Sequence, residues 1–424
     1  MNRKINDKSL PDVQGMQDSF VSNMEAIVNF VENVGPVVTE YDEKVSKTIE
    51  KAKQKIIKIL GPKFEEKQDT DSNREGQKDR NKERVVEEAA EGVIQILGKY
   101  NRLPRMDIGQ VELLYRSAFV LLNAFLDYLI HDVISCYYES YPQSLSEKDK
   151  ELTIDLSSLS LCSDIDDAVD MIIEKKVDSI TYKNLMDQKR FLKEYLSLDL
   201  RESVVNWDII NEAVERRNVI IHNECVVNRR YLRSVELTVI PEGKRLKEGD
   251  KVVVNSEYFT KVHEEIFMAG VLIAQSCWRK WQKEELEEAD ASLIQVMYRQ
   301  LLEEKWHLVE KLGYASKDME TKDVASRWAI DINYCQALKW QGKEAELQKE
   351  ISAIDESSLS PKFKACLAAL KGNRDDFYKY AEQAVMIDEL DNEAFDVWPL
   401  FRELRQDAEY KDKIKAILSR KSDN

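Results

Sequence analysis

The chain has 424 residues, and its 63 Lys and Arg against 79 Asp and Glu give a formal net charge of −16 at neutral pH. Because phosphate contacts need basic side chains, such an acidic chain can bind nucleic acid only where those side chains are concentrated. Six scattered cysteines, none at zinc-knuckle spacing, exclude a disulfide framework and favour reduced thiols in a cytosolic protein. With only 13 Gly and 8 Pro, the composition favours an all-α fold of two or three domains.

The N-terminus has no apolar segment of signal-peptide length. The most apolar run, AFVLLNAFLDYLIHDVI at 118–134, is interrupted by Asn123, Asp127, His131 and Asp132. We therefore expect a buried helix at this place and not a membrane span, and a soluble cytoplasmic protein without membrane contact.

Residues 1–64 are predicted to form an N-terminal helical region. Apolar residues recur at three- and four-residue spacing from Met16 to Val31, and a second amphipathic run follows residue 37. The intervening NVGPV at 33–37 predicts a break between two helices, because Gly and Pro both end helices. The second run can pack within the chain or form a coiled coil with a partner.

Residues 65–85 contain almost no apolar side chain, which predicts a charged linker or a solvated helical spacer. A central helical domain is predicted over residues 86–285. Its helices include the apolar one around 113–134 and an amphipathic one that carries Trp207. Between 235 and 254, β-branched runs around Pro-Glu-Gly and Glu-Gly-Asp predict a small hairpin or an extended loop.

Residues 286–424 are predicted to form helical hairpins. An Ala-Leu pair precedes a glycine turn twice, and the two glycines, Gly342 and Gly372, lie 30 residues apart. The arrangement resembles degenerate tetratricopeptide repeats, although the period is shorter. A solenoid-like stack and a general helical bundle both fit this pattern.

One stretch of the central domain, NEAVERRNVIIHNECVVNRRYLR at 211–233, surrounds a histidine with arginines and asparagines. Asn218 and His222 are four positions apart and share a helical face. Arg217 and His222 are five apart, about 140° round an ideal helix. They can meet at one site only through the long reach of Arg217 or a distortion of the helix near His222.

The segment RRNVIIHN, the apolar helix before it and VNRRYL after it resemble the HEPN ribonuclease family over residues 110–280. The resemblance implies an HEPN-like helical bundle, with Arg217 and His222 catalytic and Asn218 in support. It also implies a homodimer that brings two motifs to one cleft. The alternative is that His222 has a structural role.

A ribonuclease of this charge must concentrate its basic residues near the motif. The predicted RNA-binding residues all lie in or just after it, and they are Arg216, Arg229, Arg230, Arg233, Lys244, Arg245 and Lys247. A solvated basic face that pairs with the acidic remainder would explain the same residues.

The resemblance implies a metal-independent endoribonuclease with RNA as substrate and no cofactor. It further implies a role in toxin-like or antiphage defence, with a regulatory protein partner bound through the terminal regions. Two alternatives stay open, namely a non-catalytic helical scaffold whose repeats bind a protein and an RNA-binding module. The sequence lacks a P-loop, a dinucleotide-binding glycine motif and a paired histidine–carboxylate metal pattern.

Overall fold

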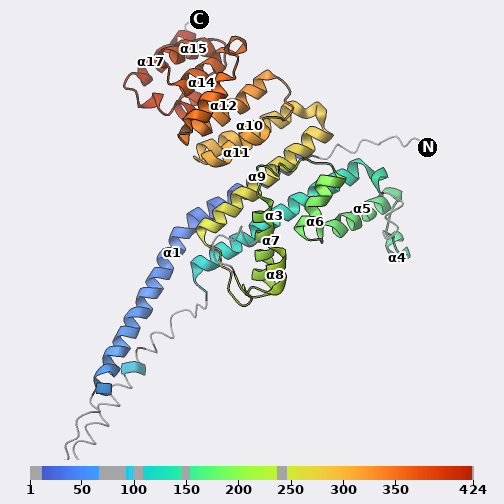
Figure 1. Cartoon of the computed structure of the whole chain (residues 1–424), viewed down its shortest axis with the longest axis vertical. Coiled ribbons are helices and arrows are strands. Elements are labelled where there is room, and N and C mark those ends of the chain that lie inside the picture. Colours follow the sequence, from blue (N-terminus) through green and yellow to red (C-terminus); the bar gives the residue numbers. More distant parts are fainter. Residues whose placement is uncertain are drawn as a thin grey trace, which may run out of the picture. The chain divides into compact units, whose positions relative to one another are not determined.

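The computed structural model describes residues 12–65, 92–94, 96, 98, 108–145, 153–235 and 246–422. These residues are mainly helical and contain no β-strand, which confirms the predicted all-α class (Figure 1). The main helices are α1 (Val13–Glu65), α3 (Gln110–Ser140), α4 (Leu156–Leu159), α5 (Ile165–Thr181), α6 (Leu185–Arg190), α7 (Trp207–His222), α8 (Arg229–Ser234), α9 (Ser256–Trp281), α10 (Leu286–Leu302), α11 (Trp306–Ser316), α12 (Val324–Trp340), α13 (Glu344–Ser352), α14 (Pro361–Lys371), α15 (Arg374–Met386), α16 (Asn392–Val397) and α17 (Tyr410–Ser422).

The chain divides into two compact units, and the division falls inside α1, α3 and α9. The first unit holds residues 1–24, 122–250 and 260–424, and the second holds 25–121 and 251–259. In the second unit the Asp42 carboxylate accepts the backbone N–H groups of Gln110 and Val111, each at 3.0 Å. Asp42 therefore supplies the cap that the first turn of α3 lacks in its own sequence.

The predicted break at 33–37 is wrong, because α1 continues as one helix through Gly35 and Pro36. A proline inside a helix removes one backbone hydrogen bond. Side-chain contacts support the helix after this point, including the pair between Lys44 and Glu40 at 2.6 Å and the bond from Thr39 to the Gly35 carbonyl at 2.7 Å. The residues next to Pro36 are themselves weak helix formers, so the helix continues here because of the long helical runs before and after this stretch.

The second half of α1 is half-buried along one narrow stripe. Its members are spaced alternately four and three residues apart, at Val38, Asp42, Val45, Ile49, Ala52 and Ile56. This is the spacing of a coiled-coil seam. The choice between packing within the chain and a partner helix stays a prediction.

In the first unit, the buried start of α1 packs closely on α9. A Cβ atom added at Gly270 of α9 would lie 2.2 Å from ring atoms of Phe20 in α1. Phe20 is itself buried. The absence of a side chain at Gly270 therefore lets the two helices approach each other.

We expect Gly270→Ala to destabilise the protein, because overpacking of a core costs about 1–3 kcal/mol and exceeds the helix preference of Ala. The matched control is Gly35→Ala, because Gly35 also lies inside a helix and nothing lies within 4 Å of an added Cβ there. Urea unfolding followed by circular dichroism should show a lower midpoint for Gly270→Ala and an unchanged or higher midpoint for Gly35→Ala. Equal shifts in the two variants would contradict the packing argument.

The C-terminal helices form successive pairs, with α11 packed on α12, α12 on α13 and α14 on α15. Helix α12 also packs against both α10 and α14, so these three helices form a row. Gly342 and Gly372 end their helices at φ +70° and +71°, which confirms the two glycine turns. A hydrophobic cluster runs from Ile332 to Ile417, so this region has a core of its own.

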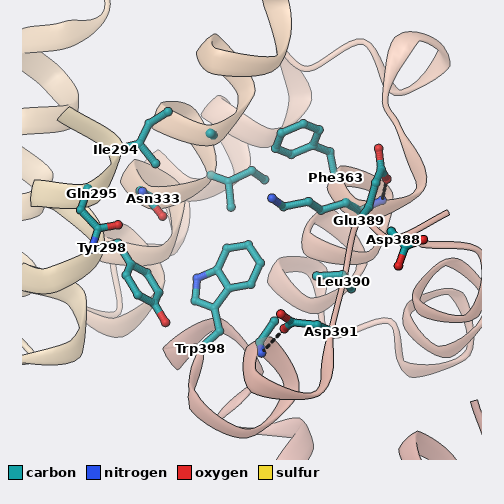
Figure 2. A pocket seen from close by; sticks show the side chains of 14 residues that line it. Ile294, Gln295, Tyr298, Asn333, Phe363, Asp388, Glu389, Leu390, Asp391 and Trp398 are labelled. Atoms are coloured by element: carbon teal, nitrogen blue, oxygen red, sulfur yellow. Dashed lines mark hydrogen bonds between the residues drawn. The ribbon is translucent and has the colours of Figure 1, made fainter. Parts of the chain in front are cut away.

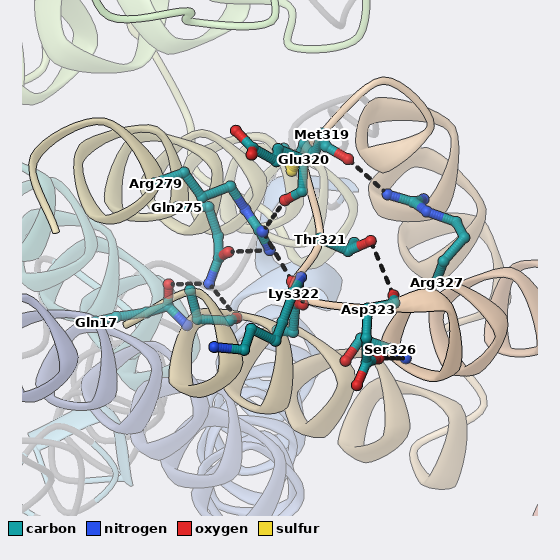
Figure 3. A network of polar contacts seen from close by, with 12 residues as sticks. Gln17, Gln275, Arg279, Met319, Glu320, Thr321, Lys322, Asp323, Ser326 and Arg327 are labelled. Atoms are coloured by element: carbon teal, nitrogen blue, oxygen red, sulfur yellow. Dashed lines mark hydrogen bonds and ion pairs between the residues drawn. The ribbon is translucent and has the colours of Figure 1, made fainter. Parts of the chain in front are cut away.

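A cavity of about 320 Å³ opens among α10, α12, α14 and the segment that leads into α16 (Figure 2). A buried polar network lies at the start of the same region and links α1, α9 and α10 (Figure 3). Gln275 of α9 donates to Gln17 of α1 at 3.0 Å and to the Ala289 carbonyl of α10 at 3.1 Å. Arg279 lies 2.7 Å from Asp290, whose carboxylate also accepts the Lys322 backbone N–H.

The predicted hairpin or loop at 235–254 is described only in part, since residues 236–245 lie outside the described residues. Residues 246–254 form a turn followed by an extended segment, in agreement with the loop alternative. The backbone N–H of Val227 bonds the Asp250 carbonyl at 2.8 Å, and Gly249 bonds the Val227 carbonyl at 2.9 Å. This loop is therefore fixed against the segment that follows α7.

Among the described residues, α3 is the single helix long and apolar enough to cross a membrane, and half of its most apolar window is buried inside the protein. Phe119, Leu122, Leu126 and Ile130 are each almost inaccessible to solvent.

Candidate functional site

Helix α7 carries the Arg–His motif and is anchored along one side. Its cap is Asn206, whose side chain accepts the Ile209 backbone N–H. Trp207 and Ile210 are buried, and the Trp207 indole N–H donates to the Leu200 carbonyl at 3.2 Å. The first three turns therefore fix the direction in which the motif leaves the core.

His222 is the last residue of α7, and its side chain is exposed. The helix ends at Asn223, whose amide donates to the Val226 carbonyl, and the next two residues, Glu224 and Cys225, have positive φ values of 49° and 65°. The Cys225 backbone N–H bonds the Val219 carbonyl at 3.2 Å. The turn is thus held by its backbone, while the imidazole makes no hydrogen bond to any described residue.

Arg217 lies between solvent and the core, with 21% of its side chain exposed, and its guanidinium donates to Asp127 of α3 at 3.2 Å. Burial raises the pKa of the Asp127 carboxyl, and the charge of Arg217 opposes that shift. The ion pair orients one edge of the guanidinium and leaves further donors for a second anion.

Helix α7 is regular through His222, so no distortion of the helix brings Arg217 and His222 together. Asn218 is half-buried one turn before His222. Only the reach of the Arg217 side chain can direct both groups to one bound phosphate within a single chain.

The structure corrects one member of the predicted RNA-binding set, Arg216. It is fully buried, and its guanidinium forms an ion pair with the buried Glu212 at 2.8 Å. The Tyr231 hydroxyl donates to the same carboxylate. Burial and Glu212 raise the pKa of Tyr231, so this hydroxyl keeps its proton at neutral pH. Arg216 therefore joins α7 to α8 inside the protein and is not available to RNA.

The other described basic candidates lie on the surface after the motif. Arg229 pairs with Glu248 at 3.0 Å, and Arg230 lies 3.9 Å from Glu215, with both arginine side chains about three-quarters exposed. Arg233 and Lys247 are exposed as well. Lys244 and Arg245 lie outside the described residues.

The remaining histidines differ from His222. His263 is buried, with its Nε2 3.0 Å from the Met24 carbonyl, and burial lowers its pKa to about 4. His131 and His307 each lie near one acidic side chain on their own helix. Within the described ranges, no group of three or more His, Cys, Asp or Glu could hold a metal ion.

Sequence reasoning missed two features of the site. Asp127 attracted notice only as an interruption of an apolar run, although an acid on a buried helix needs a partner such as Arg217. Beside Asp127, Tyr128 is 62% exposed, and Ile221 next to His222 is 48% exposed.

Neither protein-family models, curated proteins nor solved structures give a match to this chain. The geometry of the motif and the chemistry of its residues therefore carry the functional argument.

Proposed function

We propose that the chain is a metal-independent endoribonuclease of the HEPN type that acts as a homodimer. The observation that carries this proposal is the end of α7. An exposed His222 there follows Arg217, whose guanidinium is held in place by Asp127. An imidazole can take up or give a proton, and an oriented guanidinium can bind a phosphate. Cleavage of RNA by its own 2′-hydroxyl uses both kinds of group.

In the proposed reaction the 2′-oxygen attacks the adjacent phosphorus, and the bond from phosphorus to the 5′-oxygen breaks. One imidazole takes the proton of the 2′-hydroxyl, and another protonates the leaving 5′-oxygen. The Arg217 guanidinium binds the phosphate and stabilises the charge that grows on it. The products are a 2′,3′-cyclic phosphate and a 5′-hydroxyl, and Asn218 supports the arrangement by hydrogen bonding.

An acid and a base on opposite sides of one phosphodiester require two histidines, whereas each chain supplies one at this site. Closed twofold pairing is the commonest arrangement for identical chains. Residues of both chains would then meet in one cleft.

The proposed RNA path follows the exposed cations of α8, namely Arg229, Arg230 and Arg233, together with Lys247. The acidic remainder of the chain would repel RNA elsewhere, which suits a toxin-like or antiphage effector that acts only when a partner releases it. The terminal helical regions would bind such a regulator.

We expect Arg230→Gln/Arg233→Gln to weaken RNA binding uniformly across sequences. Each lost phosphate contact lowers the slope of log K against log salt by about 0.7 for a single strand, so two contacts lower it by about 1.4. Fluorescence anisotropy with a catalytically silent His222→Ala background measures the slope. Lys411→Gln, an exposed lysine of α17, is the matched control and should leave the slope unchanged. An unchanged slope in the double variant would remove α8 from the RNA path.

A further inference from the structure

The cavity among α10, α12, α14 and the segment that leads into α16 has apolar and aromatic walls. Ile332, Phe363 and Leu390 line it and are buried. Tyr298 and Trp398 are half-buried and add two more aromatic rings, and Figure 2 shows Trp398 between Tyr298 and Leu390. Such walls pack against the apolar stem of a ligand, and the face of an aromatic ring also attracts a cation.

Two carboxylates of the lining have only neutral partners. Glu389 accepts the Lys362 backbone N–H at 2.9 Å, and Asp391 accepts a backbone N–H of α16 at 2.9 Å (Figure 2). Neither carboxylate forms an ion pair with a described residue. The third acid of the lining, Asp388, is different, because it pairs with Lys421. The negative charges of Glu389 and Asp391 therefore have no cation opposite them in the described chain.

Among the lining residues, Lys362 is the single basic one. Its ammonium lies 5.7 Å from the centroid of the Phe363 ring, whose face stabilises the positive charge. It forms no ion pair with a described residue. One ammonium cannot balance two carboxylates, and the net charge of −16 on the whole chain adds to the imbalance. The cavity therefore disfavours an anion and attracts a cation.

We propose that this cavity binds an organic cation on an apolar stem. The cation donates hydrogen bonds to the Glu389 and Asp391 carboxylates, and the stem packs against Phe363, Leu390 and Trp398. A volume of about 320 Å³ accommodates a small molecule or a long side chain. The same chemistry is available from a free amine and from an arginine or lysine side chain of a peptide. This proposal does not depend on the ribonuclease activity.

Isothermal titration calorimetry on the full chain tests the proposal with two matched pairs of probes. The first pair is phenethylamine, which is protonated at neutral pH, and the neutral 2-phenylethanol. The second pair is acetyl-Leu-Arg-Leu-amide and the same peptide with citrulline, a neutral analogue of arginine. At least one cation should bind, and its neutral counterpart should bind weaker by about tenfold, because it lacks charge-assisted hydrogen bonds.

The two pairs also distinguish the sources of the cation. Binding of only the amine identifies a small-molecule site. Binding of only the arginine peptide identifies a site for the side chain of a partner. Binding of both cations shows that the shared chemistry is sufficient, and each of these three results supports the proposal.

The variants separate the cavity from general surface charge. Asp391→Asn removes a charge but keeps the cap of α16, because Asn caps helices as well as Asp does, and it should weaken binding by about tenfold. Glu389→Gln should act in the same direction. Lys362→Gln removes the one opposing charge and should strengthen binding. Asp375→Asn, an exposed acid of α15 outside the lining, is the matched control and should leave binding unchanged.

A direct readout is the indole N–H resonance of Trp398, assigned with Trp398→Phe, which should shift when the cation binds. The proposal is overturned if neither cation binds at millimolar concentration, if the neutral probes bind as tightly as the cations, or if Asp375→Asn weakens binding as much as Asp391→Asn. Weaker binding by Lys362→Gln would equally contradict it. Circular dichroism and urea unfolding of each variant exclude loss of the fold as the cause.

Discussion

Replacing His222 with alanine is expected to lower the rate of RNA cleavage by about 10²–10⁴-fold, because a general acid or base typically contributes that much. The exposed imidazole makes no hydrogen bond to any described residue, so its removal should leave the urea midpoint unchanged. Cleavage of a fluorescent RNA pool by purified protein in EDTA measures the effect. Cleavage at the wild-type rate would show that His222 has no part in the reaction.

The matched control for this experiment is His307→Ala. His307 is also exposed, lies on α11 and has Glu310 at 3.8 Å. Removal of an exposed imidazole away from the motif should therefore have no effect on cleavage. Mixing wild-type chains with an excess of His222→Ala chains adds a test of the composite cleft. Because mixed dimers hold one imidazole and the reaction needs two, the activity per wild-type chain should fall; unchanged activity per wild-type chain, or monomers in sedimentation at micromolar concentration, would contradict the shared cleft.

Replacing Arg216 with alanine is expected to destabilise the fold by about 3–5 kcal/mol, because it leaves the buried carboxylate of Glu212 without its cation. The Tyr231 hydroxyl, the second group on this carboxylate, cannot neutralise its charge. The loss would be measured as a lower urea midpoint, with an unchanged slope of the unfolding free energy against urea concentration.

The exposed Arg229 supplies the control for the stability measurement. Arg229→Ala removes a pair with Glu248 in which both side chains are exposed, and it should leave the midpoint unchanged, since exposed ion pairs contribute little. If Arg216→Ala instead had a wild-type midpoint and weaker RNA binding, Arg216 would belong to the RNA surface after all and the assignment of its role would be wrong.

The two neighbouring arginines show how far the sequence could predict this site. Successive residues on a helix point about 100° apart, so Arg216 and Arg217 cannot face the same surroundings. The sequence indicated a helix with a polar edge, and α7 confirms the helix. It could not indicate which arginine faced inward, because that depends on where Glu212, Tyr231 and Asp127 lie in the folded chain.

The same reasoning explains the outcome for the long helices. Local signals predicted an apolar helix around 113–134, and α3 covers that range, because apolar residues dominate the run. They failed at Pro36, where the long helical runs before and after this stretch outweigh one lost hydrogen bond. The cap of α3 by Asp42 joins residues far apart in sequence, and no local pattern could predict it.

The C-terminal cavity was equally hidden from the sequence. Asn333, Lys362 and Trp398 come from separate segments, and none belongs to a recognisable motif. Only the packing of α12 beside α14 and the segment into α16 brings them to one hollow.

The chemical ends of cleaved RNA test the central claim most directly. Attack by the 2′-hydroxyl without a metal ion predicts 2′,3′-cyclic phosphate and 5′-hydroxyl ends, formed in EDTA by the wild-type protein and strongly reduced with His222→Ala. Mass spectrometry of a defined oligoribonucleotide, and of the same oligonucleotide with 2′-deoxy residues as an uncleavable control, gives the answer. Ends with a 5′-phosphate, cleavage of the 2′-deoxy control, or no cleavage of any RNA would contradict the proposed ribonuclease mechanism.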